Sequence, residues 1–536
     1  MTKQEPRRLE VDRQELETIL ERTRAGALSP EDHEKLKAAV DTLGILTREL
    51  ETKGTSLDRL RRLLFGPSTE TTSRVLGDVA GDQGGATRDG ETVKEKRPGH
   101  GRHGVAAYHG ADQVKVAHPS LKPGDRCPAC DQGKVYTQAE PATLVRVRGM
   151  APLSATVYEL DRLRCNACGG VYTADAPDGV GTAKYDETAA AMTGLLKYGA
   201  GIPFYRLEKL EKNLGIPFPA ATQWEVVAKA AGLLGPAHEE HLRQAAQGEV
   251  LYNDDTTMKI LQMMPSEPEP GTKERTGIFT SGIVSTADGH KVALFFTGRK
   301  HAGENLEKVL AQRARELAPP IQMCDALSWN TAGEFETIVA NCLAHARRQY
   351  VDVAGRFPEE CRHVLETLRD VYRNDALARE REMSAAERLT FHQEQSGPLM
   401  DGLETWFRKQ IEQHLVEPNS GLGEAITYTQ KLWLKLTLFL RKPGAPLDNT
   451  ICERALKRVV LHRKNALFYK TENGARVGDL FMTLIHTAEL NHVNPFDYLV
   501  ALQRHARQLA QNPSAWMPWN YQATLAQITT GPSPPG

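Results

Sequence analysis

Three acidic residues stand in sequence contexts that suit metal-assisted phosphodiester chemistry. Asp254 lies in GEVLYNDDTTMKILQ, Asp325 in PPIQMCDALSWN and Glu453 in PLDNTICERALKRVVLHRKN. Carboxylate oxygens are the ligands that Mg²⁺ and Mn²⁺ prefer in proteins. Two such ions about 3.5–4 Å apart activate the attacking oxygen and stabilise the leaving oxygen of a phosphodiester. The triplet therefore predicts a catalytic site for two magnesium or manganese ions, with each acid as a ligand.

Short strands must position the two aspartates. Asp254 and Asp325 each end an apolar run that is typical of a buried strand. Between these runs, GIFTSGIVSTADGHKVALFFT predicts an antiparallel meander with a tight turn at Asp288-Gly289. The stretch from His301 to Leu317 predicts a helix that leads into the strand QMCDA. Three antiparallel strands, a helix and a fourth strand are the order of a ribonuclease-H-like core.

In that core the first and fourth strands are neighbours, so Asp254 and Asp325 would project side by side. Because side chains alternate along a strand, Asp255 would point to the opposite face. The predicted catalytic domain spans 248–475, with long amphipathic helices inserted over about 355–440.

The helix that begins near Glu453 is unusually basic. A solvated, salt-bridged helix is one interpretation. The excess of positive charge beside a single acid favours phosphate binding instead. The basic residues and histidine that follow the acid are Arg454, Lys457, Arg458, His462, Arg463 and Lys464.

Two CxxC pairs predict a second kind of metal centre, within residues 120–180. Cys127 and Cys130 form one pair, and Cys165 and Cys168 form the other. Each pair makes a tight turn whose thiolates converge, and four thiolates complete a closed tetrahedral Zn²⁺ site. The segments ATLVRVRGM and ATVYELDRLRC between them predict strands, as in a zinc ribbon. The zinc would be structural; two unconnected reduced pairs are the alternative.

The remaining segments are predominantly helical or polar. Leucines recur every seven residues within 1–65, which predicts a coiled coil and self-association, or else a helical hairpin. The Gly- and charge-rich stretch 66–119 predicts a flexible basic linker. Residues 186–240 predict three short helices, either a helix-turn-helix DNA-binding unit or a packing layer. Residues 476–525 predict a C-terminal helical element and 526–536 a disordered tail.

Composition limits the classes of function. A length of 536 residues predicts several domains, so the fold class is multidomain α/β and α. The formal net charge of -1 excludes a uniformly basic surface, so a DNA partner must meet local basic patches. No apolar run reaches the roughly 20 residues that span a bilayer. These features, together with two CxxC pairs among eight cysteines, predict a cytoplasmic protein without a membrane partner.

Further motifs make the sequence resemble the transposases of the insertion sequence 66 family, a branch of the DDE transposases. The segments that carry the resemblance outside the acids are Leu63-Leu64-Phe65-Gly66 with Ser68 and Glu70, the GHGR of 99–102, both CxxC pairs and GIPFYRLEKL. The family's D-x-T pattern falls on Asp254-Asp255-Thr256 and selects Asp254, with Asp255 as the fallback. Its second acid falls on Asp325.

Two longer family motifs follow. C-x-x-H-x-R-R falls on Cys342, His345, Arg347 and Arg348, and D-N-x-x-x-E-R falls on Asp448, Asn449, Glu453 and Arg454. Cys342 and His345 are spaced to bind zinc, but a structural or DNA-contacting role is the favoured interpretation. The sequence departs from the family at Thr257, where proline is usual, and in CDALSWN, which is looser than D-G-Y-x-x-Y. Every catalytic position is retained.

The resemblance implies a bacterial, nucleoid-associated enzyme that binds the terminal inverted repeats of its element, cleaves DNA and joins it to target DNA. It also implies small accessory proteins of the same element. The predicted DNA contacts are Arg347, Arg348, Asn449, Arg454, Lys457, Arg458, Arg463 and Lys464. Two alternatives are a metal-dependent nuclease that does not join DNA and a transposase-derived DNA-binding regulator without catalysis.

Overall fold

The computed structural model describes residues 111–264 and 275–530, with short gaps below residue 183, and scattered positions before residue 111. Two compact units emerge: Gly84–Ser154, and Met1–Gln83 together with Ala155–Gly536. The predicted coiled coil and linker lie almost entirely outside the described residues, so both stay predictions. The predicted tail begins too early, because residues 526–530 complete a helix.

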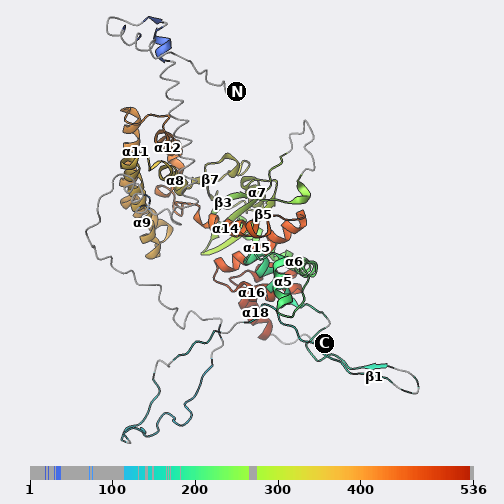
Figure 1. Cartoon of the computed structure of the whole chain (residues 1–536). Helices are drawn as coiled ribbons and strands as arrows, with labels where there is room; N and C mark the ends of the chain where they lie inside the picture. The colour runs from blue at the N-terminus through green and yellow to red at the C-terminus, as the bar shows by residue number, and fades with distance from the viewer. Residues whose placement is uncertain are drawn as a thin grey trace, which may run out of the picture. The chain divides into compact units, whose positions relative to one another are not determined.

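A five-stranded mixed sheet forms the centre of the larger unit, with the strand order β5-β4-β3-β6-β7 (Figure 1). Its strands are β3 (Val250–Thr257), β4 (Phe279–Ala287), β5 (His290–Gly298), β6 (Ile321–Cys324) and β7 (Ile338–Asn341). The first three are antiparallel, and β6 and β7 run parallel to β3. Asp288 and Gly289 have φ angles of 48° and 78°, so the predicted tight turn is confirmed.

The first and fourth strands of the sheet are neighbours, as predicted. β3 pairs with β6 in the register Tyr252↔Met323, which brings the residues two positions further along each strand to the same edge. β3 is longer than its apolar run, because Asp254 still pairs with Gly282 of β4. The predicted helix between the fourth strand and the meander is shorter than expected: α7 spans Ala302–Leu310.

Helices from both sides of the sheet in the sequence surround it. They are α4 (Glu187–Gly194) with a π turn at Leu195–Gly199, α5 (Phe204–Asn213), α6 (Ala220–Ala246), α14 (Thr450–Ala466), α15 (Glu472–Leu490), α16 (Pro495–Arg504), α17 (Ala506–Gln511) and α18 (Tyr521–Thr530). Among them, α6, α14 and α15 contact the strands of the sheet directly. The shared core contains Leu234 of α6, Phe295 of β5 and Phe481 of α15. The helices of 186–240 therefore belong to the same core as the sheet.

The third of those helices differs from the prediction. α6 is one helix of 27 residues and not a short recognition helix. Gln223 near its start is fully buried, and its side chain donates to the carbonyl of Phe218 at 2.7 Å. A buried glutamine cannot contact bases, so this position supports the packing-layer interpretation.

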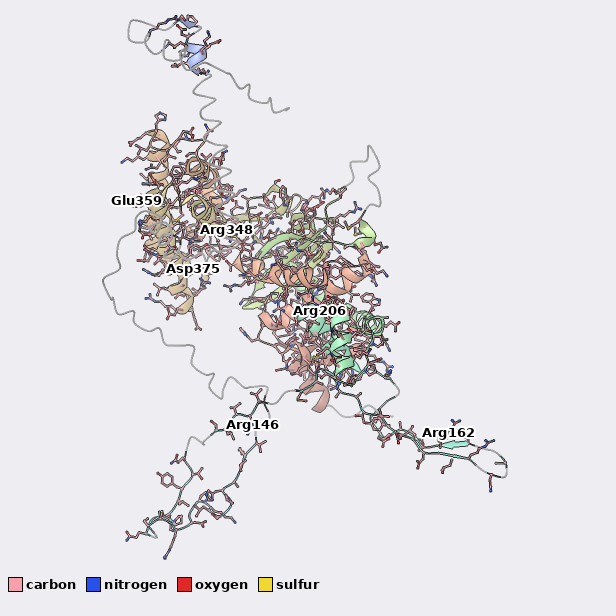
Figure 2. All side chains as sticks on the ribbon, in the orientation of Figure 1. Arg146, Arg162, Arg206, Arg348, Glu359 and Asp375 are labelled. Atoms are coloured by element: carbon pink, nitrogen blue, oxygen red, sulfur yellow. The ribbon has the colours of Figure 1, made fainter. Side chains whose placement is uncertain are left out.

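The insertion predicted over 355–440 is helical, as expected. With the helix before it, its elements are α8 (Leu343–Val353), α9 (Pro358–Glu380), α10 (Ala385–Gln395), α11 (Gly397–Glu412), α12 (Gly421–Lys431) and α13 (Trp433–Leu436). They form a second core that also includes Val250 and Met323 of the sheet. Asp375 of α9, labelled in Figure 2, pairs with Arg379 at 2.9 Å and with Arg388 of α10 at 2.6 Å. The pair with Arg388 fastens α10 to α9.

The cysteine-rich segments contain little regular structure. β1 (Arg162–Arg164) pairs with β2 (Val171–Thr173) in the larger unit. The strand predicted over 142–150 is wrong for its described part, 143–147, where Leu144 is 90% exposed. An isolated strand without a partner leaves its backbone groups to water. In the part of the chain that the structure describes, no helix has the length and apolarity to cross a membrane.

Candidate active site

Asp254 and Asp325 meet at one edge of the sheet, where a single amide contacts both. The Nδ2 atom of Asn330 donates to Oδ1 of Asp325 at 2.5 Å and lies 3.5 Å from Oδ1 of Asp254. The backbone N–H of Asp255 also donates to Asp254, at 2.8 Å. The structure therefore brings together the two aspartates that the strand pattern placed side by side.

A pocket of about 420 Å³ opens over this pair. It is lined by Asp254, Asp255, Phe279, His301, Asp325, Leu327 and Trp329. The prediction that Asp255 points away from Asp254 is wrong, because both line this pocket at the end of the strand. The Oδ2 atom of Asp255 lies 2.8 Å from Nδ1 of His301. The ring of His301 in turn lies 4.2 Å from Phe279 and 5.6 Å from Trp329, centroid to centroid. The lining thus combines three carboxylates with a cluster of rings formed by Phe279, His301 and Trp329.

The electrostatics of the pocket favour a cation. Burial, together with the nearby carboxylates of Asp325, Asp255 and Glu453, raises the pKa of Asp254 to about 7, although the hydrogen bond from the backbone of Asp255 lowers it. A divalent ion among these oxygens would neutralise their mutual repulsion. The donor set consists of hard carboxylate oxygens, which fits magnesium or manganese.

A network of buried amides holds Asn330, the residue that contacts both aspartates. Nδ2 of Asn253 and Nε2 of Gln322 each donate to the carbonyl of Asn330 at 2.7 Å, and Gln322 also donates to Oδ1 of Asn253 at 2.9 Å. These three residues are fully buried. Local residue patterns do not predict this network; the one sign of it in the sequence is an amide side chain within each of two apolar strands, Asn253 in β3 and Gln322 in β6. Because the network links β3, β6 and the loop after β6, it fixes the spacing of the aspartates.

Asn449, predicted to contact DNA, belongs to the same interior. It is fully buried, and its side chain donates to the carbonyl of Asn253 at 3.0 Å. It stands at the start of α14 and joins that helix to β3. Its position supports bracing of the site and not a contact with DNA.

The start of α14 approaches the sheet closely beside Asp254. The Sγ atom of Cys452 donates to the carbonyl of Gly282, the residue that pairs with Asp254. A β-carbon on Gly282 would lie 3.0 Å from Leu456 of α14. Glycine at this strand position therefore lets α14 pack on the sheet, and Glu453 follows directly after Cys452 in the first turn.

Glu453 does not line the pocket that Asp254 and Asp325 share. Its Oε1 atom lies 3.8 Å from Nδ1 of His345. The Sγ atom of Cys342 completes a group whose three ligand atoms lie within 4.8 Å of one another. The structure thus joins the first two acids through Asn330 and a shared pocket, and the third acid faces the Cys-x-x-His motif.

The other predicted DNA contacts fall into two groups. Arg454, Lys457 and Lys464 are exposed on α14, and Arg348, labelled in Figure 2, is exposed on α8, where Arg347 is partly exposed. Two arginines bind the protein itself. Arg458 pairs with Glu489, and Arg463 donates to Oγ1 of Thr256 at 3.1 Å and of Thr257 at 2.7 Å. Arg463 therefore ties the end of α14 to the end of β3.

The predicted zinc site is described only in part. Cys165 lies outside the described residues, so the four-cysteine arrangement stays a prediction. Within Gly84–Ser154, Cys127 and Cys130 sit in a turn closed by hydrogen bonds between Cys127 N and Gly133 O at 2.8 Å and between Gly124 N and Val135 O at 2.8 Å. Hydrogen bonds from the backbone of Gly133 and Gln132 lower the pKa of the Cys130 thiol. A lowered thiol pKa favours the thiolate that zinc requires.

Comparison with known proteins identifies relatives of the whole chain. The profile of the transposase IS66 family matches residues 183–477. Among curated proteins of Sinorhizobium fredii, uncharacterized protein y4jD is 25% identical over 532 residues, covering 92% of this chain and 98% of the relative. Uncharacterized protein y4hP is 25% identical over 508 residues, covering 88% of each. The profile match includes the sheet, the helical insertion and all three acids.

Proposed function

The chain belongs to the IS66 family of transposases, and we propose that it is a DDE transposase, which cleaves DNA at the ends of its mobile element and transfers the freed ends to target DNA. The observation that carries this proposal is the juxtaposition of Asp254 and Asp325 at the edge of β3 and β6. Only such convergence turns two scattered acids into a common site for metal ions.

A ribonuclease-H-like core is proposed for the sheet. Three features support it: the antiparallel meander β3-β4-β5, the parallel addition of β6 and β7 beside β3, and α7 between β5 and β6. Asp254 lies on β3, and Asp325 directly follows the end of the adjacent strand β6. The third acid comes from α14, which packs over β3 and β4.

The proposed roles follow from these placements. Asp254 and Asp325 would hold magnesium ions, which would activate the attacking oxygen and stabilise the leaving oxygen. Asn330 holds both aspartates at a fixed spacing through its amide. The rings of His301 and Trp329 offer flat surfaces beside the acids for a nucleotide at the cleavage point. Exposed Arg454 and Lys457 on α14 would contact DNA phosphates.

Further parts of the proposal concern partners. The four cysteines Cys127, Cys130, Cys165 and Cys168 would hold one structural zinc ion, and the segment 1–65 would join copies of the chain. Terminal inverted repeats and target DNA would be the substrates. Small accessory proteins of the same element would complete the system, in the bacterial cytoplasm.

Cleavage and strand transfer can be separated in one assay. Purified protein would be incubated with Mg²⁺, labelled DNA carrying the ends that flank its gene, and a supercoiled target. Wild type should nick the ends and join a pre-cleaved end to the target. Asp254→Ala, Asp325→Ala and Glu453→Ala should each abolish both steps and retain DNA binding in a gel-shift assay.

Other outcomes would favour the alternatives. Cleavage without any joined product would indicate a nuclease. DNA binding without either step would indicate a regulator derived from a transposase. Loss of activity in Asp255→Ala with activity retained in Asp254→Ala would overturn the choice of the first ligand.

A further inference from the structure

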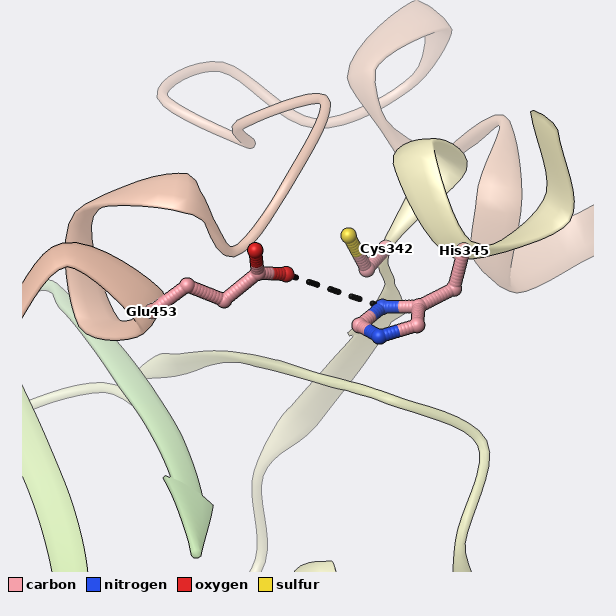
Figure 3. A group of neighbouring side chains, drawn as sticks. All are labelled: Cys342, His345 and Glu453. Carbon is pink, nitrogen blue, oxygen red and sulfur yellow. Dashed lines mark ion pairs between the residues drawn. The ribbon is translucent and has the colours of Figure 1, made fainter. Parts of the chain in front are cut away.

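Cys342, His345 and Glu453 form a compact group outside the aspartate pocket. Cys342 caps the start of α8, His345 lies in its first turn, and Glu453 lies in the first turn of α14. Figure 3 shows the carboxylate of Glu453 and the ring of His345 facing each other, with the sulfur of Cys342 beside them. Three different ligand types thus converge from two helices.

The spacing fits a shared metal ion better than a direct hydrogen bond. The distance of 3.8 Å between Nδ1 of His345 and Oε1 of Glu453 exceeds the roughly 2.7–3.2 Å of a hydrogen bond. Two ligands held about 2.1 Å from a tetrahedral ion lie about 3.4 Å apart. The sulfur also lies within 4.8 Å of both atoms. A small closing movement would place all three around one ion.

The ring nitrogen of His345 that faces the group lacks a hydrogen bond. Its Nδ1 atom is buried and has no hydrogen-bond partner among the described residues. A buried nitrogen without a partner costs free energy. A cation at the centre of the group would remove that cost, since neutral imidazole is a common metal ligand.

The ligand types select the metal. A thiolate, an imidazole and a carboxylate match the donors of Zn²⁺, whereas magnesium takes oxygen ligands. The sulfur of Cys342 is buried, and it accepts the backbone N–H of Asn449 at 3.3 Å. Three protein ligands leave one coordination position open.

We propose that Cys342, His345 and Glu453 bind a zinc ion, which holds the carboxylate of Glu453 away from the Asp254–Asp325 pocket and so opposes magnesium-dependent catalysis. The first part of the proposal, zinc binding, depends only on the three ligands, and is called the binding half. The inhibitory half rests on the proposed function, because it requires Glu453 as the third catalytic acid. In the present arrangement Glu453 faces the zinc ligands and is absent from the pocket lining.

The first experiment measures binding. Full-length wild type and Cys342→Ser would be titrated with Co²⁺ as a zinc analogue, and their zinc content measured after dialysis. The difference spectrum should contain a thiolate-to-cobalt charge-transfer band, and the variant should hold one equivalent less zinc. Subtraction removes the contribution of the CxxC pairs, which are unchanged.

Two further variants make that result decisive. Cys361→Ser is the matched control, because Cys361 is equally buried in α9 and outside the metal-ligand group; it should match wild type in spectrum and zinc content. His345→Gln repeats the test without altering a thiol, in case Cys342→Ser fails to fold by circular dichroism. Wild-type zinc content and spectrum in a folded Cys342→Ser or His345→Gln would overturn the site.

The second experiment measures inhibition. DNA cleavage in Mg²⁺ would be followed at increasing buffered free Zn²⁺. The zinc concentration for half-inhibition should rise at least tenfold in Cys342→Ser, whose activity without zinc should equal that of wild type. Equal inhibition of both would overturn the inhibitory half. If wild type cleaves no DNA at all, the proposed function fails, while the zinc measurement still decides the binding half.

Discussion

The Asp254–Asp325 pocket and the Cys342–His345–Glu453 group differ in how the fold holds their ligands. The pocket carries oxygen ligands on adjacent strands, and buried amides fix them from behind. The second group carries sulfur, nitrogen and oxygen on the first turns of two helices, and two of its side chains are about one-third exposed. The first arrangement suits a fixed hard-metal geometry, whereas the second brings together ligands from two separate helices, α8 and α14.

The largest difference should appear in catalysis. In zinc-free buffer with Mg²⁺, Asp325→Asn should reduce DNA cleavage on the order of a thousandfold, because it removes a charged ligand for the metal. Cys342→Ser should stay within about twofold of wild type, because Cys342 is not among the residues that line the aspartate pocket. A twofold change in rate corresponds to less than about 0.5 kcal/mol of activation free energy. Initial cleavage rates measure both. Equal losses in the two variants would show that both regions serve one catalytic site.

The pH dependence of the free energy of unfolding reports on the buried Asp254 of the pocket. The folded pKa of Asp254 is about 7, well above its value in an unfolded chain of about 3.9. The folded state therefore binds the extra proton, and the free energy of unfolding falls as pH rises from about 4 to about 7. In metal-free buffer Asp254→Asn should remove a decline of a few kcal/mol, measured by urea denaturation at each pH.

A part of the decline should persist in Asp254→Asn. Burial also raises the pKa of Asp479 to about 7, so this residue contributes with the same sign. Cys342→Ser serves as the control and should keep the full wild-type decline. If the free energy of unfolding of Asp254→Asn falls with pH as much as that of wild type, burial does not raise the pKa of the Asp254 carboxyl.

The loop that carries Asn330 offers a backbone test of the pocket. A β-carbon at Gly303 of α7 would lie 2.4 Å from the carbonyl oxygen of Thr331 and 2.7 Å from that of Trp329. Gly303→Ala should therefore displace this loop, lower the free energy of unfolding by about 1–3 kcal/mol and reduce cleavage. Gly232→Ala in α6, where nothing lies within 4 Å, should instead stabilise by up to about 1 kcal/mol.

Both glycine variants would be unfolded in urea, and zinc content would be measured alongside. Gly303→Ala should leave the zinc content unchanged, because the loop supplies none of the three ligands of the Cys342–His345–Glu453 group. A stability equal to that of wild type would show that the loop adapts without cost.

Loss of the bridging amide should reduce activity less than loss of an aspartate ligand does. Asn330→Ala removes the donor to both aspartates and leaves the ligands themselves in place. Loss of such an orienting partner reduces activity by about 10- to 100-fold. The Mg²⁺ concentration for half-maximal cleavage should rise, and zinc inhibition should not shift. A shift in zinc inhibition would mean that the two regions are coupled through the loop.

Much of the sheet and part of the site follow from local patterns. Alternation and β-branched residues predict the strands, and Asp288-Gly289 predicts the turn, because these are short-range preferences of the backbone. The pairing of Asp254 with Asp325 follows from strand order. The length of α6 was not predicted, since Pro219 and the residues after it fit a short helix as well as a long one. The buried amides were not predicted either, because burial depends on distant neighbours.

The residue types and their order along the chain set the available chemistry: the ligand types, their strand and helix contexts, and family membership. Where Glu453 faces depends on tertiary packing. That direction depends on how α14 packs over Gly282 and where α8 begins relative to it. Such packing depends on many contacts between segments far apart in the chain, and the local helix and strand propensities of the residues do not predict it. The same acid that completes the DDE motif in sequence thus lies, in the fold, against a cysteine and a histidine.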